Sequence, residues 1–191
     1  KPFSGVATMT VRDSRELVTC RLNDNTEAEN AFQYYDRPTT IFTGSDSVKA
    51  GKFSFSFAVP RDINYSNGNG LINVYAVNDD HDHIVHGSCD RFLVGGSAEL
   101  TNDSIGPSIY CYLNSPSFEN GGRVNSTPYF VARLTDKDGI NVSGSGIGHN
   151  LELIIDGDMN KTYVLNDNFQ YEFGSYTSGS TYYNIPPLAP G

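Results

Sequence analysis

The 191-residue sequence has few sulfur-containing side chains and no tryptophan. It contains two methionines and three cysteines. Three cysteines allow at most one internal disulfide, and the sequence leaves open whether Cys20 pairs with Cys89. The cysteine count therefore does not decide the redox compartment.

Positive charge is also scarce. The 13 Lys and Arg residues are outnumbered by 22 Asp and Glu residues, which gives a formal net charge of −9, and no basic run occurs. This balance excludes binding to nucleic acid or to an anionic membrane surface. No apolar run approaches the roughly 18 residues that a membrane-spanning helix needs, so we expect no membrane span.

Strand and turn residues dominate what is present. The sequence holds 12 Tyr, 11 Phe, 19 Gly and 9 Pro, a composition typical of secreted or cell-surface β proteins. Short stretches in which apolar and polar residues alternate recur about every ten to fifteen residues, as expected for a series of β-strands. Only residues 26–35 could hold a helical turn. The predicted strands are residues 6–11, 16–22, 39–43, 52–59, 71–77, 91–94, 108–113, 129–134, 151–155, 162–165, 170–173 and 181–184.

Two of these strands predict where the cores lie. Residues 52–59 place Phe53, Phe55 and Phe57 on one face, and we expect this strand to pair with residues 71–77 and to form the first core. In residues 108–113, Cys111 shares a face with Ile109 and Leu113, which predicts a buried, unreactive thiol.

A glycine-rich break at residues 95–97 divides the chain. The sequence predicts an all-β protein with two tandem antiparallel β-sandwich, immunoglobulin-like domains, at residues 1–97 and 98–191. The second part offers six strand candidates, whereas a complete sandwich of this kind has about seven. We therefore expect the second domain to be truncated, with one sheet edge left without its partner.

Two acidic segments are candidates for metal binding. His81 and His83 would point the same way on a strand and could share a metal, but their surroundings favour a solvated hairpin turn. Asp156 and Asp158 resemble part of a calcium loop without its twelve-residue pattern. We expect no cofactor, and a structural calcium ion between carboxylates of separate loops stays open as an alternative.

Other chemical patterns predict no catalysis. Cys89 is close in sequence to His86, but the negative charge of the neighbouring Asp90 would disfavour the thiolate that a nucleophile needs. Residues 143–149 are glycine-rich yet lack the lysine and following helix of a phosphate-binding loop. The exposed tyrosines Tyr34, Tyr35, Tyr182 and Tyr183 could stack on sugars, so surface carbohydrate binding is the alternative function.

Several motifs in order resemble one family. They include GKFSFSFAVPRDINY at residues 51–65, FLVGG at 92–96 and LIID at 153–156, together with residues 68–70, 74–76, 106–107, 138–141, 146–149 and 164–166. These resemble the region that follows the protease domain in PorU-like type IX secretion sortases, which are gingipain-related cysteine peptidases of Bacteroidetes. The resemblance runs from about residue 32 to the end of the sequence.

The resemblance implies a parent protein at the cell surface, associated with the outer membrane or extracellular. Its catalytic domain would use a Cys/His pair, remove C-terminal signal domains from secreted cargo and join that cargo to lipopolysaccharide. Nothing in this sequence matches those Cys or His motifs. We therefore expect a non-catalytic accessory module that positions the parent peptidase domain or docks an outer-membrane or secreted-cargo protein.

Overall fold

The computed structural model describes residues 2–20, 31–60, 63, 67–96, 105–143 and 150–189. These residues form antiparallel sheets and two short 3-10 helices, which confirms the prediction of an all-β, β-sandwich fold. In these ranges no helix is both long enough and apolar enough to cross a membrane.

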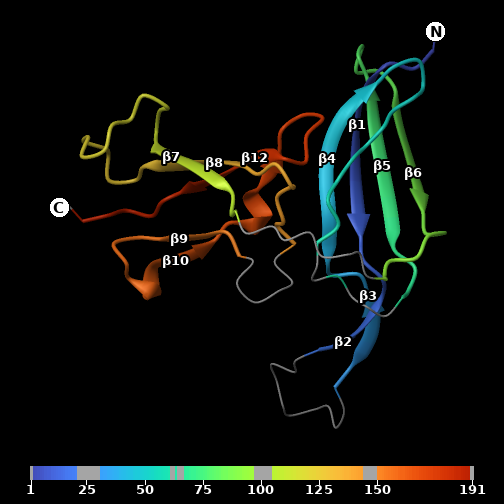
Figure 1. Cartoon of the computed structure of the whole chain (residues 1–191), viewed down its shortest axis with the longest axis horizontal. Helices are drawn as coiled ribbons and strands as arrows, with labels where there is room; N and C mark the ends of the chain where they lie inside the picture. The colour runs from blue at the N-terminus through green and yellow to red at the C-terminus, as the bar shows by residue number, and fades with distance from the viewer. Residues whose placement is uncertain are drawn as a thin grey trace.

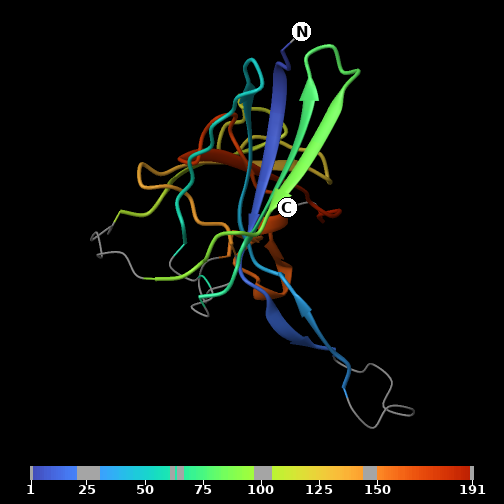
Figure 2. The same ribbon diagram turned by 90° about the vertical axis from the view of Figure 1, so that its right-hand side faces the viewer.

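A four-stranded antiparallel sheet dominates the first half of the chain (Figure 1). Its strands, in spatial order, are β4 (Thr40–Val48), β1 (Gly5–Arg12), β5 (Leu71–Asn78) and β6 (Ile84–Cys89). A separate pair, β2 (Glu16–Thr19) and β3 (Gln33–Asp36), extends away from one end of this sheet (Figure 2). Burial alternates along β1, so one face of the sheet is apolar and the other is polar.

The second half contains another four-stranded antiparallel sheet. Its order is β11 (Gln170–Tyr171), β12 (Ser178–Asn184), β8 (Tyr129–Thr135) and β7 (Ser108–Leu113). Beside it lie the pair β9 (Glu152–Ile154) and β10 (Thr162–Val164) and the 3-10 helices η1 (Met159–Lys161) and η2 (Asn166–Asn168). Ala132 and Leu134 point inward from β8 and pack with Ile140.

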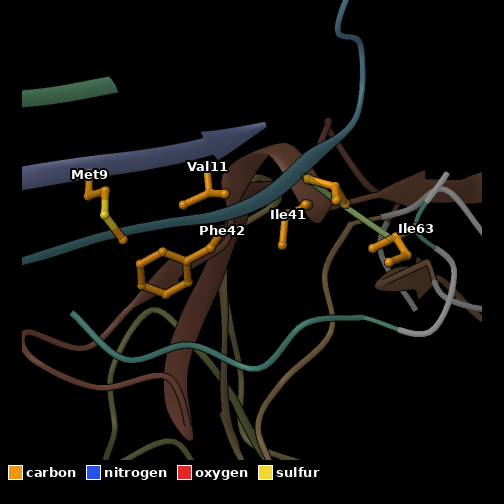
Figure 3. Packing of buried hydrophobic residues seen from close by; sticks show 6 residues of the cluster. Met9, Val11, Ile41, Phe42 and Ile63 are labelled. Atoms are coloured by element: carbon orange, nitrogen blue, oxygen red, sulfur yellow. The ribbon is translucent and has the colours of Figure 1, made fainter. Parts of the chain in front are cut away.

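The largest core cluster gathers on the inner face of β1 and β4 (Figure 3). Met9 and Val11 come from β1, and Ile41 and Phe42 come from β4. The register between the two strands shifts at Val11, so β4 contributes two consecutive buried residues there. A bulge of this kind accommodates one extra residue and bends the strand.

Residues from the second half complete this cluster. The ring of Tyr171 lies 5.1 Å from that of Phe42, and Tyr176 also packs on the cluster. The backbone N–H of Gly174 donates to the carbonyl of Ser45 in β4 at 2.9 Å. The two halves therefore share one apolar cluster and a backbone hydrogen bond at the β4 edge.

Gly139 shows how closely the halves approach. Its φ is +105°, and a Cβ atom there would lie 2.7 Å from the Cβ of Ala58. Nearby, the hydroxyl of Tyr171 donates to the carbonyl of Ile140. Burial raises the pKa of Tyr171 to about 12, because ionisation would place a charge inside the shared cluster.

Neither the division into residues 1–97 and 98–191 nor the truncation of the second domain is tested by these contacts, and both stay predictions. Ser97 lies outside the described residues, whereas Gly95 fits tightly, since a Cβ there would lie 2.1 Å from Oδ1 of Asn67. After β12, Ile185 and Leu188 donate backbone hydrogen bonds to Pro128 and Ser126. The proline-rich end of the described chain thus runs beside the residues that precede β8.

Three local predictions are wrong. Residues 53–60 form no strand, and β5 pairs with β1 and β6 instead. Phe55 and Phe57 still pack on the core, but Phe53 is 47% exposed, because this segment covers the sheet without joining its hydrogen-bond ladder. Residues 91–94 form only an isolated bridge. Of the possible helical turn at residues 26–35, residues 33–35 lie in β3, and residues 26–30 lie outside the described residues.

The predicted environment of Cys111 is also wrong. Cys111 pairs with the inward-facing Ala132, so it does lie on the inner face, yet both Cys111 and Ile109 are exposed. Tyr112 on the opposite face is buried instead, with Arg133 over its ring. The inner face of β7 lacks a covering layer within the described chain.

We expect Phe42→Ala to lower the free energy of unfolding by about 3–5 kcal/mol, because it opens a cavity in the shared cluster. Phe53→Ala is the matched control and should cost much less, since that ring is half exposed. Urea denaturation measures both effects. Amide hydrogen exchange should also speed up in β12 of Phe42→Ala, and unchanged exchange there would contradict coupling between the halves.

Candidate functional site

An open groove lies beside the edge strand β6. Its volume is about 450 Å³ and its lining is mainly apolar. The residues around it come from β5, β6, the end of β4 and the segments on either side: Phe3, Val48, Gly51, Phe53, Ile72, Val74, Ala76, Val85, His86, Gly87, Ser88 and Cys89. The groove is therefore a continuation of the inner apolar face of the first sheet.

The groove exists because the inner face is covered unevenly. Over β1 and β4, Phe55, Phe57, Tyr171 and Tyr176 bury the cluster around Phe42. Among the described residues this layer does not extend over β6, and Val85 on the same face is 49% exposed. A soluble protein rarely leaves apolar sheet surface uncovered without a partner for it.

Gly87 provides the free space in the middle of β6. It pairs with Val74 of β5, so its missing side chain would point to the inner face. A Cβ atom built there meets nothing within 4 Å. The groove is thus open above Gly87, between Val85 and Cys89.

The backbone of β6 has an unpaired outer side, because β6 pairs only with β5 in the described chain. The N–H of Asn78 donates to the carbonyl of His83 at 3.1 Å, which identifies one hydrogen-bonded pair of the ladder. Such pairs alternate in an antiparallel ladder. The backbone groups of Val85, Gly87 and Cys89 therefore face β5, and those of Ile84, His86 and Ser88 face away from it.

Acidic residues cluster at the start of β6. Asp79, Asp80 and Asp82 belong to the turn before the strand, whereas Asp90 after the strand is followed directly by Arg91; all are exposed. Asp82 accepts hydrogen bonds from His83 Nδ1 at 2.7 Å and from Asn78 Nδ2 at 2.6 Å. The hydrogen bond and the charge of Asp82 raise the pKa of His83, and the same contacts lower the pKa of Asp82.

The predicted metal ligands belong to two separate turns. His81 adopts a positive φ in the β5–β6 turn and β6 begins only at Ile84, so the strand geometry that would have aligned His81 with His83 does not apply. Asp156 lies in a turn, and Asp158 accepts a hydrogen bond from the backbone N–H of Asn160 at 3.0 Å, which lowers its pKa. In the described ranges, no three His, Cys, Asp or Glu side chains are arranged to hold a metal.

The thiols and tyrosines are spread over the molecule. All three cysteines are free, and Cys89 and Cys111 are exposed. Partial desolvation of the Cys111 thiol raises its pKa. The two tyrosine pairs considered above lie on different strands. Tyr34 and Tyr35 are in β3, and Tyr182 and Tyr183 are in β12. The glycine-rich residues 144–149 lie outside the described residues.

The groove was not predicted from the sequence, because strand β6 was not recognised. The dense run of Asp and His before Ile84 suggested a turn that continued to Gly87, although only its first part is a turn. The residues Val85 and Cys89, each two positions from Gly87, give the only indication in the sequence that one face of this strand points inward. Phe3 and Phe53, which also line the groove, are far from β6 in sequence.

Comparison with known proteins confirms the predicted PorU-like resemblance. A crystal structure of dimeric latent PorU from Porphyromonas gingivalis matches 99% of this chain, with 38% sequence identity and a TM-score of 0.53. The chain spans 18% of that PorU chain. No protein-family model matches the sequence, and no curated protein matches it significantly.

We expect Asp82→Ala to lower the pKa of His83 toward its ordinary value, because the mutation removes the hydrogen bond and the nearest negative charge. Asp80→Ala is the control, since Asp80 acts on His83 only through its charge and more weakly. Titration of the imidazole signals by nuclear magnetic resonance measures both. Equal shifts in the two variants would contradict the Asp82–His83 contact.

Proposed function

Because the chain is a PorU-like region that spans 18% of the PorU chain it matches, we propose that it is an accessory β-sandwich module of a longer cell-surface peptidase. The parent would be a gingipain-related cysteine peptidase of the type IX secretion sortase kind. The module itself would be non-catalytic and would hold the peptidase domain in place or dock an outer-membrane or secreted-cargo protein.

The single observation that carries this proposal is the match over 99% of the chain at 38% identity. Two features of the structure support a docking role. An apolar groove lies open beside a strand edge that no other described strand pairs with, and further apolar side chains such as Ile109 are exposed on the inner face of β7. In the described part of the chain no thiol is hydrogen-bonded to a histidine, which is the pair that a cysteine peptidase needs.

Deleting this module from the full-length parent tests the proposal. We expect the parent to keep its cleavage of a short peptide substrate and to lose processing of folded cargo, because only the second step needs a docking surface. Cargo processing is measured by the loss of the C-terminal signal domain. Normal processing would contradict the accessory role, and peptide hydrolysis by the isolated 191-residue chain would contradict the non-catalytic assignment.

Carbohydrate binding is the second candidate, favoured by an aromatic pair on the second sheet. The rings of Tyr129 and Tyr182 lie 5.8 Å apart on neighbouring strands, and Tyr182 is 38% exposed. Paired, exposed rings of this kind can stack on sugar rings. Binding on a glycan array that disappears in Tyr182→Ala but persists in Tyr35→Ala would support this site, and the absence of glycan binding would exclude it.

A further inference from the structure

We propose that β6 binds an extended polypeptide strand of a partner protein, which carries apolar side chains at alternate positions and basic residues at the end that lies beside the acidic turn before β6. This inference deepens the docking role proposed above and rests on it. The partner strand would add to the sheet beside β6 and place its apolar side chains in the groove over Gly87.

The backbone of β6 determines the first part of this recognition. Ile84, His86 and Ser88 present their N–H and C=O groups on the outer side of the strand, where no described strand pairs with them. Exposed strand edges of this length pair readily with another strand. The opposite edge of the sheet differs, because the carbonyl of Ser45 in β4 already accepts a hydrogen bond from Gly174. Figure 1 shows β6 on the side of the sheet away from the second half.

The groove determines which side chains fit. Alternate side chains of an added strand would lie on the same face as Val85 and Cys89 and could reach over Gly87. There they would meet the apolar lining from Phe3, Phe53 and Val74. Burial of these side chains provides affinity that an edge without a groove lacks. The edge strand β7 carries the exposed Ile109 but does not border this groove.

The charges determine one end of the partner strand and disfavour a second copy of this chain as the occupant. Asp79, Asp80 and Asp82 lie before β6, so lysine or arginine at the adjoining end of a partner strand would be attracted. At the other end Asp90 is next to Arg91, and the two charges offset each other. Each copy of this chain carries a formal net charge of −9, which opposes the pairing of two copies.

The test uses the whole 191-residue chain and a labelled peptide of sequence Lys-Lys-Val-Thr-Val-Thr-Val-Lys-Lys, with binding measured by fluorescence anisotropy. Two control peptides replace either the four lysines with glutamate or both threonines with proline, because in an antiparallel strand with its valines in the groove the threonine N–H groups face β6. We expect the lysine-flanked peptide to bind, and both controls to bind about tenfold more weakly or worse. Equal binding of all three peptides would overturn the proposal.

Two variants at adjacent positions locate the binding. His86→Pro removes an outward N–H while leaving the ladder with β5, and proline is tolerated on edge strands; His86→Ala is its control. Gly87→Leu fills the groove without a clash, because a Cβ atom there meets nothing within 4 Å. We expect His86→Pro and Gly87→Leu each to weaken peptide binding about tenfold and His86→Ala to leave it unchanged. Far-ultraviolet circular dichroism checks that each variant is folded.

A chemical measurement gives an independent readout. In a Cys20→Ser, Cys111→Ser background, the exposed thiol of Cys89 borders the groove and reacts with maleimide. Bound peptide should slow this reaction, and no protection at saturating peptide would contradict binding at β6. Sedimentation that shows dimers lost in His86→Pro would instead assign the edge to a second copy.

Failure of this inference can be told apart from failure of the proposed function. If His86→Pro in the full-length parent leaves cargo processing intact while deletion of the module abolishes it, the accessory role stands and β6 is not its docking site. If deletion also leaves processing intact, the accessory role itself is wrong.

Discussion

A four-stranded sheet with one apolar face needs that face covered, and the described part of this chain covers only half of it. Phe42 marks the covered half: its ring stacks on Phe57 and packs against Tyr171 from the second half of the chain. Because aromatic rings bury large apolar areas, this cluster accounts for the close approach of the two halves. The remaining half, over β5 and β6, holds the groove. The same constraint thus produces both the most buried region of the first sheet and its most open one.

The uneven cover also explains the contrast between the two edges of the first sheet. The β4 edge is next to the second half and receives a hydrogen bond from Gly174. The β6 edge has no such neighbour among the described residues, and it has neither an inward-pointing lysine nor a proline, which proteins commonly use to block an edge. Among the described residues, the charged neighbours of this edge are the acidic turn before it and the Asp90–Arg91 pair after it, and the acidic turn acts against another acidic strand rather than against every strand. An edge protected in this way discriminates between partners by charge.

The strands of the second half could be predicted from the sequence more accurately than those of the first. Residues 108–113 and 129–134 alternate clearly and have turn residues on both sides, and they became β7 and β8 almost without change. Residues 52–59 alternate just as clearly, yet they form no strand, because alternation reports which side chains are buried and not whether the backbone finds a ladder partner. The sequence predicts correctly that Cys111 lies on the inner face of β7, but it predicts wrongly that the side chain is buried. Periodicity gives the direction of a side chain, whereas burial depends on a covering layer from distant parts of the chain.

The groove could not be predicted from the sequence for a related reason. Its most informative features are backbone groups of Ile84, His86 and Ser88 and the missing side chain of Gly87, and neither has a residue signature that a motif could capture. Recognition through the backbone depends on a free strand edge and on pockets for alternate side chains. Both conditions are set by the topology of the fold and not by a sequence motif. The similarity to PorU identifies the kind of protein to which such an edge belongs, but function still has to be argued from the site. Within the described residues the site consists of one unpaired strand edge, one uncovered apolar surface and one acidic turn, and the occupant that fits all three is a strand with alternating apolar side chains and a basic end.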